Sequence, residues 1–304
     1  MTKHYCFPIF LLALATLAQA APAAAQQDQQ VPEVVMHDPV ADTAHPARME
    51  VPDILSHGKR LYAIFYIASG EFPHPTVLLM HGFPGNEQNL DLAQAMRRAG
   101  WNVLFPHYRG SWGSEGSFSF SNSIEDTQAA LQFLRDPANV KKYGIDVKRI
   151  VLIGHSMGGF MVAYAGSHDL GVLAVGMISA WNIGKTLKNP VEGPALKEFQ
   201  ADASRLAGTT AGQLITEGKW NAAKWNFVDY APALKARPVL IIESDDGLQP
   251  ADHEFAEALR NAGNASVSEQ HIAADHTYSD HRIALEAAVV SWLQQMQSET
   301  KIRN

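Results

Sequence analysis

Short runs of consecutive apolar residues alternate along the chain with stretches whose apolar residues repeat every three or four positions. The runs predict buried strands, at residues 76–80, 101–106, 149–154, 172–180 and 238–244, and we expect SVSEQHI, at 266–272, as the last strand. The periodic stretches predict amphipathic helices, at residues 90–98, 124–134, 159–166, 255–262 and 282–296. Strands of this fully apolar type, separated by helices, are typical of a mostly parallel central sheet with helices on both faces, so we predict an α/β fold.

Two segments depart from this alternation. Residues 49–68 have the pattern of two strands joined by a turn at Gly58. Residues 181–235 contain helix-like stretches and no strand-like run, so we interpret them as a helical cap inserted into the fold. Large aromatic residues usually pack in a core. The cap nevertheless lies between the central strand at 149–154 and the strand at 238–244, whose ends carry the candidate chemistry below, so its tryptophans are also candidates for substrate binding: Trp181, Trp220 and Trp225.

The N-terminus has the layout of a cleavable secretory signal. A basic start precedes an apolar run, Cys6–Leu17, and small residues follow it. The run is shorter than the roughly 20 residues needed to span a bilayer. We therefore predict a signal peptide at 1–25, a flexible leader at 26–48 and one folded domain at 49–304, with the product secreted or periplasmic and no membrane span in the mature chain.

Composition excludes several function classes. The formal net charge of the 304-residue chain is −7, and no dense run of lysine and arginine is present, so we expect no nucleic-acid partner. Cys6 is the single cysteine and lies in the predicted signal peptide. Disulfides, thiolate metal sites and a cysteine nucleophile are therefore excluded for the mature chain.

The sequence GHSMGG, at residues 154–159, matches the pattern G-x-S-x-G between an apolar run and a helical period. Small residues two before and two after Ser156 would permit a sharp, strained strand-to-helix turn. Such a turn holds the serine hydroxyl above the carboxyl edge of the sheet, where α/β folds bind ligands. The alternative interpretation is a packing turn without chemistry.

A nucleophilic serine needs a base, and the base needs a carboxylate that orients it. The order of these residues in the fold that uses G-x-S-x-G is serine, acid, histidine. The sequence DDGLQP, at residues 245–250, follows the predicted strand at 238–244. In it, Asp246 is our preferred acid and Asp245 the alternative. After the last strand, His276 is the preferred base because it lies in a loop, whereas His271 lies within the strand and His281 near the closing helix.

An oxyanion site needs two N–H donors. The sequence HGFPG, at residues 81–85, follows the first buried strand, and its glycines would let the backbone approach a substrate. We predict the backbone N–H groups of Phe83 and Met157 as the donors. For His81 we favour a loop-stabilising side chain over a catalytic one.

Together these motifs resemble the α/β-hydrolase superfamily, from about Met49 to the C-terminus. The sequence RGSWGSEGSF, at residues 109–118, is also similar to a glycine-rich loop in catalytic domains of prolyl-oligopeptidase and dipeptidyl-peptidase type. Those peptidases carry a large propeller domain in front of the catalytic fold, whereas here we expect only a short leader. The resemblance implies no metal and no organic cofactor, and the chain has no HExxH element.

The expected function is therefore that of a serine hydrolase, which would cleave an ester or amide bond of a small substrate through an acyl-enzyme on Ser156. A carboxylesterase-like activity on a small-molecule ester is the first expectation. The alternative is a secreted peptidase of the dipeptidyl or prolyl-oligopeptidase type that acts on short peptides without a propeller. An acyltransferase and a non-catalytic binding protein are further alternatives of the same fold.

Overall fold

The computed structural model describes residues 31–303, so the predicted signal peptide at 1–25 lies outside the described residues. A central sheet of eight strands has the order β1-β4-β6-β5-β7-β8-β9-β10. Its strands are β1 (Arg48–Glu50), β4 (Ala63–Ile67), β5 (His74–Met80), β6 (Asn102–Pro106), β7 (Ile145–His155), β8 (Ala174–Ile178), β9 (Val239–Glu243) and β10 (Val267–His271). β4 pairs antiparallel with β1 and β6, and the other pairs are parallel. The predicted α/β-hydrolase fold with a mostly parallel sheet is confirmed.

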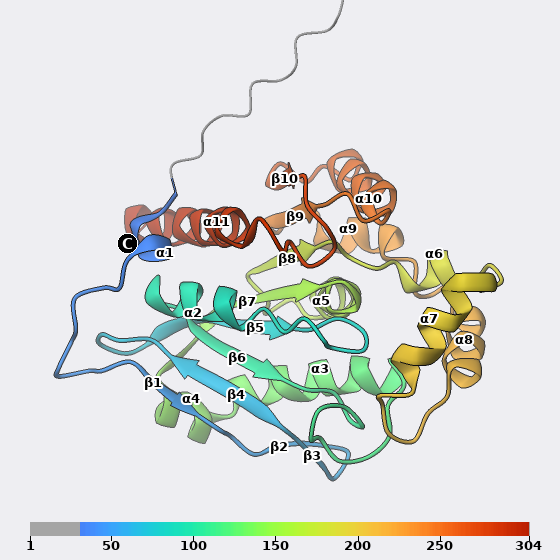
Figure 1. Ribbon diagram of the computed structural model, residues 1–304. Coiled ribbons are helices and arrows are strands. Elements are labelled where there is room, and N and C mark those ends of the chain that lie inside the picture. The colour runs from blue at the N-terminus through green and yellow to red at the C-terminus, as the bar shows by residue number, and fades with distance from the viewer. Residues whose placement is uncertain (1–30, 304) are drawn as a thin grey trace, which may run out of the picture. The chain divides into compact units, whose positions relative to one another are not determined.

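Helices cover both faces of this sheet (Figure 1). α2 (Leu90–Arg98) and α11 (Arg282–Arg303) pack on one face. α3 (Phe120–Arg135), α5 (Met157–His168) and α10 (Gln249–Asn261) contribute to the core on the other.

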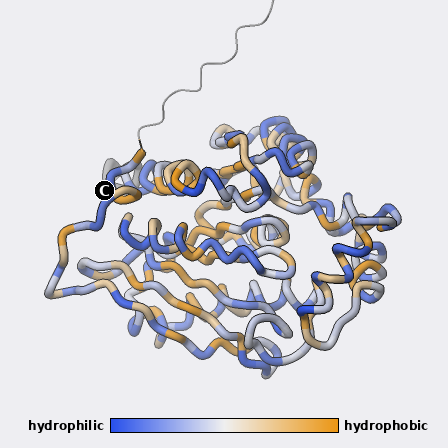
Figure 2. Tube along the Cα trace, viewed as in Figure 1, coloured by the Kyte–Doolittle hydropathy of each residue, from blue (hydrophilic) through white to orange (hydrophobic). Residues whose placement is uncertain are grey.

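Successive residues of β5 divide between the two cores. Val77 and Leu79 pack with α2 and α11, and Leu78 and Met80 pack in the opposite core. Because side chains alternate across a strand, a strand buried on both faces must be apolar at every position. Figure 2 accordingly shows hydrophobic residues gathered along the central strands, with hydrophilic residues on the outer helices.

Helix ends follow local capping chemistry. α2 has the predicted bounds, and Gly100 follows its C-cap residue Ala99; the φ of Gly100 is 88°, which is left-handed, and its N–H donates to Arg97 O. α3 begins four residues before the predicted start, because the Ser119 side chain accepts a hydrogen bond from Asn122 N and caps the helix. The sequence pattern missed the short helix α4 (Pro137–Tyr143), which uses Asp136 as its N-cap and Pro137 as its first residue.

The N-terminal part of the domain contains the predicted hairpin. β2 (Ile54–Ser56) and β3 (Lys59–Leu61) pair antiparallel around His57 and Gly58, which have φ values of 49° and 74°. Within the segment that we expected as a flexible leader, α1 (Glu33–Met36) buries Val35 against α2 and α11. This helix has four residues, which are too few to produce a recognisable apolar period.

Residues 181–235 contain helices and no strand, as predicted. They form α6 (Ile183–Leu187), α7 (Gly193–Ala203), α8 (Ala211–Trp220), a 3₁₀ helix, η1 (Phe227–Tyr230), and α9 (Ala231–Leu234). In Figure 1, α6, α7 and α8 stand at the side of the sheet toward which the arrowheads of β5, β6 and β7 point. Among residues 31–303, no helix has the length and apolar character needed to cross a membrane.

Candidate active site

Ser156 lies at a sharp turn between β7 and α5. Its φ of 55° and ψ of −120° place a non-glycine residue in a strained region, which persists only where the surroundings enforce it. Here Ser156 N donates to Ile178 O, and Ser156 O accepts from the N–H groups of Gly159 and Trp181, each at 2.9 Å. Three hydrogen bonds of its backbone therefore hold Ser156 in this conformation.

Glycines around this turn permit very close packing. A Cβ at Gly154 would lie 2.1 Å from Gly158 O, and a Cβ at Gly158 would lie 2.2 Å from Met80 O. A Cβ at Gly82 would lie 2.9 Å from Ser156 Cβ, so the backbone of the HGFPG loop passes directly against the serine. The close approaches explain why small residues flank Ser156 in the sequence.

The preferred acid and base are brought together. Asp246 follows β9 and His276 follows β10, and Asp246 Oδ2 lies 2.7 Å from His276 Nδ1. The Asp246 side chain is 3% exposed and also accepts a hydrogen bond from Leu248 N. Burial acts to raise the pKa of Asp246, but the hydrogen bonds from His276 and Leu248 outweigh it and hold this pKa below its usual range. Asp246 is therefore a carboxylate that can hold the imidazole in one tautomer.

The competing residues form other contacts. Asp245 is exposed, and its Oδ1 lies 2.9 Å from Nε2 of His271, the last residue of β10. His281 lies just before α11, and its carbonyl accepts from Leu285 N. His81 is buried, its Nδ1 lies 2.7 Å from Gly82 O, and burial lowers its pKa to about 4. The His81 contacts are those of a loop-stabilising residue.

The loop that carries His276 is fixed by its own side chains. Asp275 accepts hydrogen bonds from the N–H groups of Thr277 and Ser279. Tyr278 is fully buried, and its hydroxyl lies 2.8 Å from Ser179 Oγ, directly after β8. His276 thus lies in a hydrogen-bonded turn, outside regular secondary structure.

His155 connects this loop to the serine turn, which is a role that sequence reasoning missed. Its Nε2 lies 2.8 Å from His276 O, and the two rings are 4.6 Å apart. Burial, followed by the nearby His276, lowers the pKa of His155 to about 3, so its ring is neutral at neutral pH. A carbonyl can only accept a hydrogen bond, so Nε2 carries the proton. The His155 side chain therefore connects the backbone of His276 to the residue before Ser156. Among the described residues, no hydrogen bond joins the Ser156 hydroxyl to His276.

We predict that His155→Phe lowers kcat by about 10- to 100-fold, because a small displacement of a catalytic group can cost that much. Phenylalanine keeps the ring but cannot donate to His276 O. His155→Gln, which restores a donor, is the matched control and should recover part of the rate. Steady-state kinetics and a melting curve for each variant measure the effect. An unchanged kcat in His155→Phe contradicts the role.

The two predicted oxyanion donors belong to segments next to Ser156. Met157 is the first residue of α5, where a backbone N–H has no acceptor within the helix. Phe83 directly follows Gly82, which contacts Ser156. The neighbouring glycine-rich loop supports this segment, because Trp112 Nε1 donates to Pro84 O at 2.7 Å. Both segments thus lie near Ser156, which is the place where an oxyanion site would need its donors.

The three candidate tryptophans have different surroundings. Trp181 lies beside Ser156 through its backbone, and its ring packs against Phe83, Phe120 and Phe199. Trp225 is buried among core aromatics. Trp220 is 88% exposed at the end of α8. Phe199, which is not among the tryptophan candidates, stacks on Phe83 at 5.0 Å and is the cap residue in closest ring contact with the HGFPG loop.

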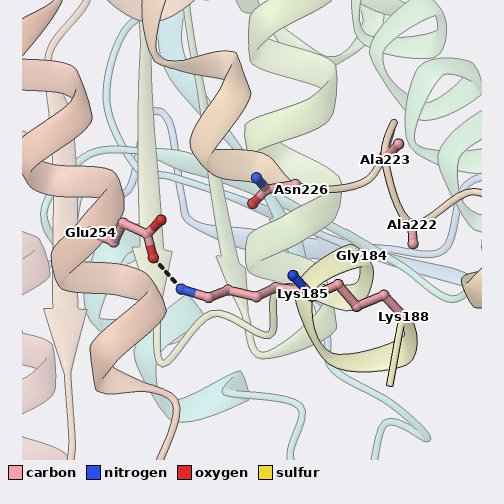
Figure 3. Close-up of a pocket in the computed structure, with 7 residues that line it drawn as sticks. All are labelled: Gly184, Lys185, Lys188, Ala222, Ala223, Asn226 and Glu254. Carbon is pink, nitrogen blue, oxygen red and sulfur yellow. Dashed lines mark hydrogen bonds and ion pairs between the residues drawn. The ribbon is translucent and has the colours of Figure 1, made fainter. Parts of the chain in front are cut away.

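A separate pocket of about 370 Å³ lies between α6 and α10 (Figure 3). Lys185 of α6 forms an ion pair with Glu254 of α10 across this pocket. Both side chains are exposed, so the pair contributes about 1 kcal/mol at most. The pocket is lined by none of the predicted site residues and lies where the cap meets α10.

The chain matches the family model described as the alpha/beta hydrolase family over residues 77–289, more than two thirds of its length. It belongs to the α/β-hydrolase family. Among curated proteins, this hydrolase is 37% identical over 106 residues to the alpha/beta hydrolase domain-containing protein WAV2 of Arabidopsis thaliana, a match that covers 34% of this chain and 33% of that protein. It is 33% identical over 206 residues to the uncharacterized protein YfhR of Salmonella typhi, which covers 62% of this chain and 69% of that protein.

Solved structures share the fold of this hydrolase at low sequence identity. The structure of Est1E from Butyrivibrio proteoclasticus with ferulic acid bound has a TM-score of 0.67 and 17% identity, with 81% of this chain and 99% of that chain covered. The acylaminoacyl peptidase of Pyrococcus horikoshii has a TM-score of 0.64 and 18% identity, with 82% of this chain and 41% of that chain covered. The chain thus spans a third of the plant relative and less than half of the peptidase.

Proposed function

We propose that this α/β-hydrolase is a carboxylesterase-like serine hydrolase that forms an acyl-enzyme on Ser156. The observation that carries the proposal is the hydrogen-bonded pair of Asp246 and His276, held beside the strained Ser156 turn by His155. A packing turn needs no such pair. Likewise, a binding protein of this fold has no need of a carboxylate oriented toward an imidazole in the loop next to a strained serine.

In the proposed acylation step, His276 Nε2 takes the proton of the Ser156 hydroxyl as Oγ attacks the carbonyl carbon of the substrate. The backbone N–H groups of Phe83 and Met157 bind the oxyanion. Asp246 accepts the Nδ1 proton of His276 in a hydrogen bond and stabilises the positive imidazolium that forms. The tetrahedral intermediate then expels the alcohol, which receives its proton from His276 Nε2.

In the proposed deacylation step, a water molecule takes the place of the alcohol. His276 accepts a proton from this water as its oxygen attacks the acyl carbon, and Ser156 Oγ leaves with that proton. The short approach between Oγ and Nε2 is expected to form with substrate in place, because such hydrogen bonds are often long without it.

Support for an apolar acyl group comes from the aromatic residues next to the serine. Phe83, Trp181 and Phe199 are half-buried and in mutual ring contact where the HGFPG loop meets the cap. The likeness to an esterase with ferulic acid bound agrees with an aromatic acid as the acyl part. Aromatic rings favour such a substrate because they bury large apolar area and stack in offset geometry.

A peptidase is the second candidate, favoured by the glycine-rich loop that follows β6. Arg109 in this loop is buried and paired with Asp126 at 2.6 Å, and Trp112 braces the HGFPG loop. The likeness to an acylaminoacyl peptidase points in the same direction.

A substrate panel tests the two candidates against each other. We expect hydrolysis of nitrophenyl esters, with aryl acids preferred over short alkyl acids, and no cleavage of aminoacyl or dipeptidyl naphthylamides. Values of kcat/KM for both sets give the comparison. Faster cleavage of the naphthylamides establishes the peptidase instead, and loss of both activities contradicts the serine-hydrolase proposal.

A further inference from the structure

Three potential metal ligands converge at one place outside the candidate active site. Glu243 is the last residue of β9, Glu269 lies in β10, and His253 lies on α10. One donor atom of each lies within 4.8 Å of the donor atoms of the other two. Three different elements therefore direct a mixed nitrogen and oxygen donor set at a common point.

Glu243 is the unusual member of this cluster. The residue is 3% exposed, and its Oε1 is buried without a hydrogen-bond partner in the described structure. Its other oxygen, Oε2, accepts a hydrogen bond from Gln249 at 3.3 Å. Burial and the neighbouring Glu269 carboxylate raise the pKa of Glu243, and a cation coordinated between the two glutamates would offset both effects.

The second carboxylate has the arrangement of a ligand with an outer support. Glu269 Oε1 lies 2.6 Å from His253 Nδ1, and Glu269 Oε2 lies 2.6 Å from Arg260 Nη2. Each glutamate thus has its Oε2 atom bonded to a neighbouring donor, Gln249 for Glu243 and Arg260 for Glu269. Hydrogen bonds of this kind orient the ligands of known metal sites.

We propose that Glu243, His253 and Glu269 bind one divalent transition-metal ion of the Zn²⁺ type. One imidazole nitrogen and two carboxylate oxygens are donors that Zn²⁺ accepts in four-coordinate geometry, with water as the fourth ligand. Ca²⁺ requires six to eight oxygen ligands, which this set does not supply. His253 Nδ1 and Glu269 Oε1, now 2.6 Å apart, must separate to admit an ion between them, and His253, whose side chain is 55% exposed, can rotate to allow this.

A bound ion would connect β9, β10 and α10 through one ligand from each. Glu243 lies three residues before Asp246, and Glu269 lies two residues before His271. The ion would tie together the two strands whose following loops carry the acid and the base. The sequence analysis predicted no metal site, because residues 243, 253 and 269 form no recognised metal-binding spacing.

Metal titration of the full chain without an affinity tag tests the proposal. After treatment with a chelator and removal of the chelator, calorimetry with ZnCl₂ should show one ion per chain, and the melting temperature should rise with Zn²⁺. His253→Ala and Glu243→Gln should each weaken Zn²⁺ affinity by on the order of 100-fold or more. The matched control is His57→Asn, which removes an exposed histidine paired with a single carboxylate, that of Glu125, at 3.3 Å.

Three outcomes would overturn the site. They are no stoichiometric binding to the wild-type chain, equal Zn²⁺ affinity in wild type and His253→Ala, and Ca²⁺ binding as tight as Zn²⁺ binding. His253 is exposed on α10, so its replacement should leave the fold intact even where Glu243→Gln does not. A far-ultraviolet circular dichroism spectrum of each variant checks this point. Both measurements are independent of hydrolytic activity.

Discussion

Ser156→Ala is expected to lower kcat for ester hydrolysis by on the order of 10⁵- to 10⁶-fold, the range seen when the nucleophile of a serine hydrolase is removed. The same variant should lose covalent labelling by a fluorophosphonate probe. The physical reason is that Oγ forms the bond to the acyl carbon, and neither the oxyanion donors nor the imidazole can replace it. The variant should remain folded, because the backbone, not the hydroxyl, makes the hydrogen bonds that hold this turn.

A second serine of the same helix provides the control. Ser167 lies near the C-terminal end of α5, and its hydroxyl donates to Tyr164 O. Ser167→Ala should keep both turnover and labelling. Labelling is read by intact-protein mass and the labelled peptide by fragmentation. If Ser156→Ala is labelled at the wild-type rate, on any residue, the assignment of the nucleophile is wrong.

The sheet was predictable from the sequence because its strands are buried on both faces. Val77, Leu78 and Leu79 are consecutive and apolar, and the structure sends them to alternate cores. The same pattern carries no sign of α1, which is four residues long, or of the cap residue Phe199, which meets the HGFPG loop only in three dimensions. Apolar patterns report the burial of an element and do not report which distant element covers it.

The candidate site was predictable where the local backbone geometry requires particular residue types in the sequence. Glycines around Ser156 reflect close approaches between backbones, and these must appear in the sequence itself. No sequence pattern indicates the role of His155, because its partner is the carbonyl of a residue in a distant loop. The convergence of Glu243, His253 and Glu269 is hidden for the same reason. Side-chain contacts between elements depend on the fold, whereas strained turns depend on the residues within them.

Spacing alone does not distinguish Asp245 from Asp246, because both carboxylates follow the same strand. The structure distinguishes their surroundings. The Asp246 side chain is buried and bonded to His276 Nδ1, whereas the Asp245 side chain is 61% exposed and bonded to His271. Neighbouring residues of one loop thus hold different histidines, and this gives an internal control for the proposed triad acid.

Asp246→Asn is expected to lower kcat by on the order of 10⁴-fold, as the loss of the orienting carboxylate does in serine hydrolases. The amide of asparagine can donate to Nδ1, which would leave the proton on Nε2 and prevent His276 from accepting the Ser156 proton. The imidazolium would also lose a buried negative charge that the structure holds ready, since the pKa of Asp246 lies below its usual range.

Asp245→Asn is the matched control, because it makes the same chemical change one residue away on an exposed side chain. We expect its kcat to stay within a few-fold of wild type. Steady-state kinetics and the rate of fluorophosphonate labelling measure both variants, and labelling should slow in Asp246→Asn, because the probe also needs an activated Ser156. If the larger loss falls on Asp245→Asn, the acid has been misassigned, and the pair of Asp246 and His276 is then structural. Equal and small effects in both variants would mean that His276 is not the base, since a base in this geometry requires its carboxylate.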